Sequence, residues 1–199
     1  MIRVLIDSSD TDLRLGIAEG KNVLFRSEQY AWQRQSELLI VELDRLLKEN
    51  GYSRHDIECV IASKGPGSYT GVRIALTVAK VMAFSIDKPL YLASSLEVLR
   101  DPKRVSVCVM NARSKRSYVG VYSPEGVLKD DCVMENEELK AYLAEHPDYL
   151  LCGNASHLGL EGAQNDLLSN LASSADEMHQ VEDVLAAKPV YLKDSYATV

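Results

Sequence analysis

A glycine-rich segment, GPGSYTG at residues 65–71, leads out of an apolar run, a position in which other loops hold phosphate or present a nucleophile. Its glycines follow the spacing GxGxxxG, one residue longer than the dinucleotide-binding pattern. Val72 stands where a P-loop carries lysine, and Ser68 follows Gly67 directly, unlike the serine of a GxSxG nucleophile turn. The residues therefore favour a strand-to-helix turn in which Ser68 or Thr70 caps the helix.

The run after this loop, from Thr70 to Ile86, is predicted to form a helix that is apolar nearly all round. Small side chains recur every four residues along it, at Gly71, Ala75, Ala79 and Ala83. Such a ridge lets another helix or sheet approach closely, and a helix with so little polar surface is covered on two sides. The second cover is either the rest of the chain or another protein. We expect the ridge to bind a partner, with the predicted helix of residues 36–50 beside it.

Two charged residues belong to the same predicted surface. Arg73, one of the few polar residues of the helix, can bind a partner's backbone or carboxylates. It can equally form a salt bridge inside its own lobe, for which Glu37 is the expected acid. Both alternatives remain open at this point, and both residues are candidates for partner binding.

Metal and thiol chemistry find little support in the sequence. The four histidines include no two residues at the HxxxH spacing that places a metal-binding pair on one helix face. The four cysteines form no CxxC pair, and Cys59, Cys108 and Cys152 lie in apolar, strand-like runs where a thiol behaves as a small buried group. We therefore predict no metal, no other cofactor, and reduced thiols.

The charge and hydropathy of the chain limit its partners. The net charge of −7 repels nucleic-acid phosphate, so the chain is not expected to hold RNA by itself. No apolar run approaches the ~18 residues that a membrane-spanning helix needs. We expect a soluble, cytoplasmic protein that makes no membrane contact.

The order of the predicted elements occurs twice along the chain. Three strands, a helix, a strand and further helix are expected in the first half, and the same order returns in the second half. This order predicts an α/β fold of two lobes, at residues 1–101 and 102–199, each a mixed sheet with helices. It resembles the actin-like (RNase H-like) ATPase superfamily, in which the first hairpin loop of each lobe grips phosphate.

The two segments that match those phosphate loops are degraded. The first keeps Asp7, Ser8 and Ser9 but lacks the glycine that lets backbone amides close on phosphate. The second has Asn111 in the position of a carboxylate, and a carboxylate binds Mg²⁺ better than an amide does. These four residues are candidates for a vestigial nucleotide site, from which we expect no efficient hydrolysis.

The segment from Gly65 to Leu99, GPGSYTGVRIALTVAKVMAF…KPLYLASSLEVL, resembles the signature of the TsaB family, also called YeaZ. The resemblance extends to VLIDSS near the start, QSELLIVELDRLL, MNARSKRSYVGVY and the closing KPVYLKD. It implies a non-catalytic subunit of the bacterial system that adds threonylcarbamoyl to an adenosine of tRNA. The chain departs from the family pattern at Gln35, Tyr69 and Asn111, where His, Phe and Asp are usual.

The resemblance also implies the partners. The catalytic relative TsaD is expected to bind the first lobe, with the small ATPase TsaE joining the complex, a homodimer as a further form, and tRNA bound only through the complex. The alternative is a free-standing nucleotide-dependent transferase or peptidase of the same superfamily. The absence of a histidine pair and of the loop glycines favours the partner subunit over the enzyme.

Overall fold

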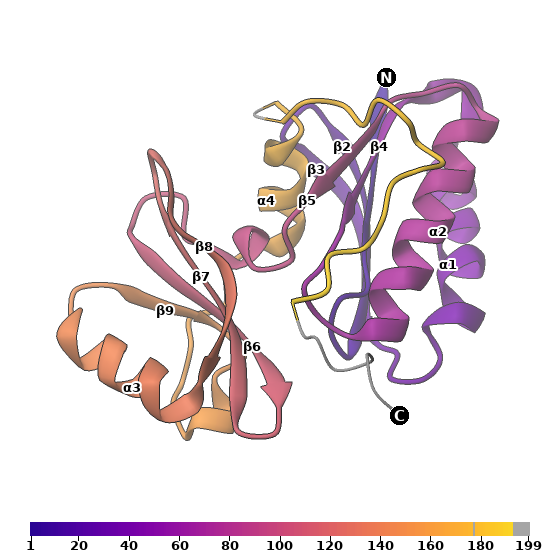
Figure 1. The fold of residues 1–199 in the computed structure, drawn as a ribbon. Coiled ribbons are helices and arrows are strands. Elements are labelled where there is room, and N and C mark those ends of the chain that lie inside the picture. Colours follow the sequence, from indigo (N-terminus) through magenta and orange to yellow (C-terminus); the bar gives the residue numbers. More distant parts are fainter. Residues whose placement is uncertain (177, 193–199) are drawn as a thin grey trace. The chain divides into compact units, whose positions relative to one another are not determined.

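The computed structural model describes residues 1–176 and 178–192 of the chain (Figure 1). Their contacts form two compact units, which we call the first and second lobes. The first lobe comprises Met1–Ser95 and Leu168–Val190; the second comprises Leu96–Leu167 and the described residues 191 and 192. A single boundary was predicted after residue 101, whereas the contacts return residues 168–190 to the first lobe. Residues 177 and 193–199 of the predicted second lobe lie outside the described residues.

The first lobe contains a five-stranded mixed sheet. Its strands are β1 (Ile2–Asp7), β2 (Asp12–Glu19), β3 (Asn22–Tyr30), β4 (Ile57–Ser63) and β5 (Leu90–Ala93), in the spatial order β3-β2-β1-β4-β5. β1, β2 and β3 pair antiparallel, whereas β4 runs parallel to both β1 and β5. The predicted hairpin turn is confirmed, with Gly20 in the left-handed conformation between β2 and β3.

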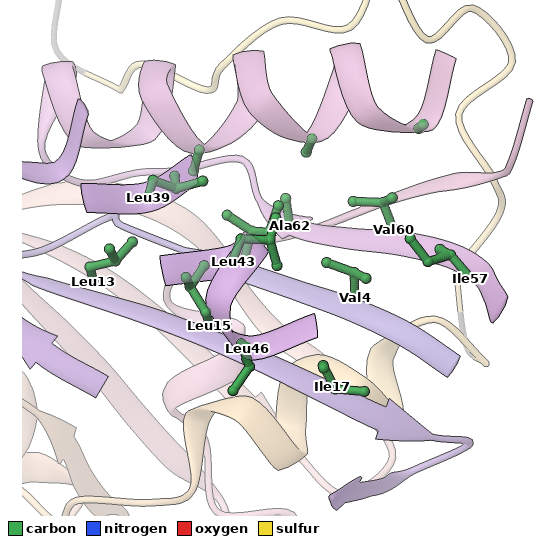
Figure 2. Close-up of a cluster of buried hydrophobic side chains, with 14 of the residues drawn as sticks. Val4, Leu13, Leu15, Ile17, Leu39, Leu43, Leu46, Ile57, Val60 and Ala62 are labelled. Carbon is green, nitrogen blue, oxygen red and sulfur yellow. The ribbon is translucent and has the colours of Figure 1, made fainter. Parts of the chain in front are cut away.

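Two helices cover one face of this sheet. They are α1 (Gln35–Glu49) and α2 (Tyr69–Ser85), which contact each other and lie side by side in Figure 1. Each begins within one residue of its predicted start. Figure 2 shows how side chains of β1, β2 and β4, such as Val4, Leu15 and Val60, meet Leu39 and Leu43 of α1. This continuous apolar layer holds both helices in place on the sheet.

Residues 168–190 are held in the first lobe by specific contacts. α4 (Leu167–Ser174) lies on the opposite face of the sheet from α1 and α2 (Figure 1). Arg3 of β1 donates to the carbonyl of Ala172 at 3.0 Å and pairs with Asp176 at 2.8 Å. Further along, the backbone N–H of Val181 donates to Leu90 of β5. The segment after α4 therefore continues the first lobe, although its sequence lacks a periodicity that would have indicated this.

The second lobe repeats the strand order of the first with fewer elements. It contains β6 (Ser106–Arg113), β7 (Arg116–Ser123), β8 (Gly126–Glu135), α3 (Asn136–Glu145) and β9 (Leu150–Gly153), with sheet order β8-β7-β6-β9. β9 is parallel to β6, as β4 is to β1. The described residues also form three short 3-10 turns: η1 (Arg54–Asp56) in the first lobe, and η2 (Glu97–Leu99) and η3 (Ser156–Leu158) in the second. The predicted class, an α/β fold of two mixed sheets with helices, is confirmed.

No helix within the described part of the chain combines the length and the apolar composition needed to cross a membrane.

Candidate functional site

The first candidate phosphate loop connects β1 to β2 and begins at Asp7, whose side chain is fully buried. Its carboxylate accepts hydrogen bonds from the Ser9 hydroxyl at 2.7 Å, from the Ser9 backbone N–H at 3.4 Å, and from the hydroxyl of Ser63. It also pairs with Arg14 at 3.2 Å. Because these donors surround the two carboxylate oxygens, the charge of Asp7 is balanced within the first lobe.

The glycine-rich segment packs directly against this loop. The backbone N–H of Ser68 donates to the Ser9 carbonyl at 2.7 Å, and the Ser8 hydroxyl donates to the Gly71 carbonyl at 2.7 Å. A Cβ atom at Gly71 would lie 2.0 Å from the Ser8 carbonyl oxygen, and one at Gly67 would lie 2.2 Å from that of Ser9. The glycines are therefore required by the close approach of two backbones, which a side chain would prevent.

The predicted cap of α2 is confirmed for Ser68. Its hydroxyl accepts a hydrogen bond from the Gly71 backbone N–H at 3.3 Å, in the geometry of an N-cap. The segment is thus a strand-to-helix turn that closes over the β1–β2 loop, rather than a phosphate grip or a nucleophile turn.

The second candidate loop, between β6 and β7 in the second lobe, is open. Asn111 is exposed, and its side-chain oxygen accepts the backbone N–H of Arg113 at 2.7 Å. Three consecutive residues, Arg113, Ser114 and Lys115, have left-handed φ values of 60°, 54° and 60°. These conformations strain residues that carry a Cβ atom. The two candidate phosphate loops therefore differ. In the β1–β2 loop, the carboxylate of Asp7 is buried and its oxygens already accept hydrogen bonds from within the lobe; the β6–β7 loop is exposed and contains basic residues.

The structure corrects the orientation of the predicted ridge on α2. Ala75, Ala79 and Ala83 have no exposed surface and belong to the apolar layer between α2 and its own sheet. Gly71 is buried as well, against the β1–β2 loop. The ridge lets α2 approach the sheet of the first lobe, so it is internal packing and not a surface on which a partner can dock. The small side chains indicated a close contact correctly, but the sequence did not distinguish an internal contact from an external one.

The opposite side of the two helices carries apolar residues in contact with solvent. We call this surface the outer helix face; it consists of Ile40 and Val41 of α1 and Tyr69, Val81 and Phe84 of α2. Ile40, Val41, Val81 and Phe84 are 60–62% exposed, and Tyr69 is 42% exposed. A groove of about 390 Å³ lies on the same face, lined by Ser36, Tyr69, Thr70, Arg73, Ile74, Thr77 and Val78.

The two charged candidates also lie on these helices, and each has its own local partner. Arg73 donates to the Tyr69 hydroxyl at 2.9 Å, and its guanidinium lies 5.2 Å from the centre of the Tyr69 ring. Glu37 is 68% exposed and pairs with Arg34 at 3.5 Å. In place of the expected Arg73–Glu37 salt bridge, the structure therefore has a cation–π pair beside the groove and a separate ion pair on α1.

Sequence reasoning missed a serine–histidine contact in the second lobe. The Ser117 hydroxyl lies 2.7 Å from Nε2 of His157 and donates to the side-chain oxygen of Asn136 at 2.9 Å. Ser117 is fully buried, and burial lowers the pKa of His157. The contact ties β7 and the start of α3 to η3, and a hydroxyl without exposed surface is poorly placed to attack a substrate. Because the two residues lie 40 positions apart, their spacing carried no signal.

Three of the four thiols, Cys59, Cys108 and Cys152, are buried, as the sequence predicts. Burial raises the pKa of Cys59 to about 11, which leaves a neutral thiol. Over residues 1–176 and 178–192, no group of three or more His, Cys, Asp or Glu side chains is arranged to hold a metal ion.

Comparisons with known proteins give the family. The model of the family described as TsaD, tRNA N6-adenosine threonylcarbamoyltransferase, matches residues 29–145. The TsaB protein of Bacillus subtilis, a tRNA threonylcarbamoyladenosine biosynthesis protein, is 30% identical over 145 residues, which are 71% of this chain. The alignment spans 63% of that relative's own length. The uncharacterized protein MG208 of Mycoplasma genitalium is 28% identical over 81% of this chain and 79% of its own.

A solved structure agrees on the fold. YeaZ from Pseudomonas aeruginosa superimposes with a TM-score of 0.82 over 96% of this chain and 99% of that one, at 19% identity. This likeness extends the correspondence to both lobes, which the family model and the Bacillus relative cover only in part. The chain therefore belongs to the TsaD family and, within it, to the TsaB (YeaZ) proteins.

Proposed function

We propose that the chain is a non-catalytic subunit of the system that forms threonylcarbamoyladenosine in tRNA, where it binds and supports a TsaD-type catalytic relative. We infer the reaction from the family, since the related Bacillus protein is named for this biosynthesis. The outer helix face is the observation that carries the binding role.

The outer helix face has the composition of a docking surface. Isolated exposed apolar residues are common on soluble proteins, but here two adjacent helices carry five of them, and the same helices line a groove. Tyr69 and Arg73 line that groove, and aromatic and arginine side chains are enriched where protein interfaces are fully desolvated. A helix of the partner laid along α1 and α2 would cover the apolar residues and leave Glu37 at the polar rim.

The closed β1–β2 loop supports the non-catalytic part of the proposal. A nucleotide-hydrolysing actin-like lobe needs an acidic side chain that can reach a bound metal, directly or through water. Asp7 is the acidic residue in that position, and it is held by Arg14, Ser9 and Ser63. Asn111, in the corresponding loop of the second lobe, supplies an amide in place of a carboxylate.

The remaining partners follow from the same proposal. A TsaE-type ATPase joins the complex, and a homodimer forms through the outer helix face when the catalytic subunit is absent. With a net charge of −7, this chain contributes little to tRNA binding, which falls mainly to the catalytic partner.

The test is to mix the chain with a TsaD-type relative and measure the mass of the complex by light scattering, with the tRNA-modification rate of the same fractions. Val81→Glu and Phe84→Glu should each weaken binding at least tenfold, because a charge then enters a desolvated contact. Val127→Glu is the matched control, since Val127 is 54% exposed on β8 of the second lobe and should bind as wild type does. Ala79→Arg is unsuitable, because it places the charge inside the first lobe.

Three outcomes contradict the proposal. Binding that is unchanged in both α2 variants removes the outer helix face as the docking surface. A complex that forms but modifies tRNA no better than the catalytic relative alone removes the supporting role. Turnover of substrate by the purified chain alone would show an enzyme, the alternative that the sequence left open.

A further inference from the structure

A segment without helix or strand follows α4 and returns along the first lobe. We call residues 178–190 the strap; it is drawn in yellow in Figure 1. The backbone N–H of Val181 donates to the Leu90 carbonyl of β5 at 2.9 Å, and that of Val190 donates to the Lys64 carbonyl at 2.7 Å. The strap is therefore bound to the first lobe near both of its ends.

Lys80 of α2 binds the strap between these two points. Its Nζ donates to the carbonyl of Leu185 at 2.5 Å and to that of Ala187 at 2.9 Å. Hydrogen bonds from a charged donor are stronger than those between neutral groups. Because one ammonium group binds two carbonyls of the strap, residues 185–187 are held against the side of α2.

The last residues of the strap lie against the glycine-rich turn that precedes α2. A Cβ atom at Gly65 would lie 2.7 Å from the Val190 carbonyl oxygen, and Gly65 has a φ of 100°. The residues Lys-Pro-Val at 188–190 also begin the closing KPVYLKD segment of the family resemblance. This part of the motif is therefore placed beside α2, on the lobe that carries the outer helix face.

The strap brings a further apolar side chain to the outer helix face. Leu185 is 55% exposed, and Lys80 binds its carbonyl. Exposed Phe84 follows Lys80 by four residues, so both residues project from the same side of α2. Val184, in contrast, packs against the core of the first lobe. The exposed apolar surface of α2 therefore continues from Phe84 onto the strap at Leu185.

We propose that the strap is a third element of the surface that binds the TsaD-type partner, and that Lys80 orders it before the partner binds. This inference rests on the proposed function. The partner is the expected occupant because Leu185 continues the same apolar surface that the partner covers at Phe84. A segment that is already ordered loses less conformational entropy on binding, so the bonds from Lys80 raise the affinity.

The first experiment measures the affinity of the full-length chain for the TsaD-type relative by isothermal titration calorimetry. Leu185→Glu should weaken binding about tenfold, because a charge then enters a desolvated contact. Leu128→Glu is the matched control, since Leu128 is 56% exposed on β8 of the second lobe. Lys80→Met, which keeps the length of the side chain and removes its donors, should weaken binding about fivefold. Lys140→Met on α3 should bind as wild type does.

The second experiment measures hydrogen exchange of the chain alone and of the complex. In Lys80→Met alone, the backbone amides of residues 181–190 should exchange about tenfold faster than in wild type, while those of β1 and β4 keep their protection. In the wild-type complex, the same strap amides should exchange more slowly than in the free chain. Retained protection of β1 and β4 establishes that each variant is folded.

Several results would overturn the inference. If Val81→Glu and Phe84→Glu weaken binding but Leu185→Glu and Lys80→Met do not, the strap is no part of the docking surface, and the proposed function stands. If none of the four weakens binding, the docking surface of the proposed function fails as well.

Two further results would also contradict it. Losses confined to self-association, measured by light scattering of the chain alone, would assign the strap to a contact with a second copy of the chain. Wild-type exchange of the strap in Lys80→Met would show that Lys80 does not order it.

Discussion

The loops after β1 and β6 occupy equivalent positions in the two lobes, but the first is buried and the second is exposed. After β1, the side chain of Asp7 is buried and the backbone of Ser8 and Ser9 is in contact with the glycine-rich turn. After β6, Asn111 is exposed, and the chain turns through Arg113 and Lys115 in a left-handed conformation. The loop after β1 is buried within its own lobe. The loop after β6 is exposed, and three of its residues have strained, left-handed backbone conformations.

Under the proposed non-catalytic role, the two loops would lack a carboxylate that can bind a metal for two different reasons. In the first lobe, the acidic group is retained, but its hydrogen-bonding capacity is used internally. In the second lobe, the residue in the loop is exposed, and it is an amide, Asn111, instead of a carboxylate. Substitutions in the first loop should therefore affect stability strongly, and those in the second should affect it weakly or in the favourable direction.

The largest effect is expected for Gly71→Ala. Helix propensity alone predicts a gain of up to about 1 kcal/mol, because alanine is the better helix former. The added Cβ atom would lie 2.0 Å from the Ser8 carbonyl oxygen, so we expect instead a loss of about 3 kcal/mol as α2 moves away from the loop. Urea unfolding measures the change, with exposed Thr77→Ala on the same helix as the control. A stabilised Gly71→Ala variant would show that the close approach is not required.

A smaller loss is expected for Asp7→Asn, which removes the charge at nearly constant shape. The hydroxyls of Ser9 and Ser63 and the guanidinium of Arg14 then face an amide that cannot satisfy all of them. We expect the free energy of unfolding to fall by about 2 kcal/mol. Asn111→Ala, the matched change in the open loop, should stay within about 0.5 kcal/mol of wild type. Equal losses in the two variants would remove the contrast between the loops.

Much of the first lobe could be predicted from sequence because its signals are local. The apolar spacing of α1, the cap at Ser68 and the glycines of the turn each act within a few residues. The direction of the alanine ridge could not be predicted, since small side chains favour close contact with a sheet as much as with a partner. The contacts of Arg3 with Ala172 and Asp176, which return residues 168–190 to the first lobe, connect positions far apart in the chain.

The contact between Ser117 and His157 in the second lobe sharpens the comparison through pH. Burial lowers the pKa of His157, so the folded chain disfavours the imidazolium form. As the pH falls below the unfolded-state value of about 6.5, the unfolded chain takes up a proton that the folded chain resists, and stability is lost until the folded pKa is reached. We expect His157→Gln to flatten this decline between pH 7.5 and pH 5.5, measured by urea unfolding. An unchanged decline would assign it to other groups.

The smallest effect, and the only favourable one, is expected at the tip of the β6–β7 loop. Lys115 has a φ of 60°, a conformation that glycine adopts without the clash of a Cβ atom. Lys115→Gly should therefore raise the free energy of unfolding by about 0.5 kcal/mol, after the greater freedom of glycine in the unfolded chain is subtracted. Glu125→Gly, in the β7–β8 turn, should instead lower it by a similar amount, because Glu125 does not have a left-handed φ. If both variants are destabilised equally, the left-handed conformation of Lys115 carries no strain, and the contrast drawn between the two loops fails at this point.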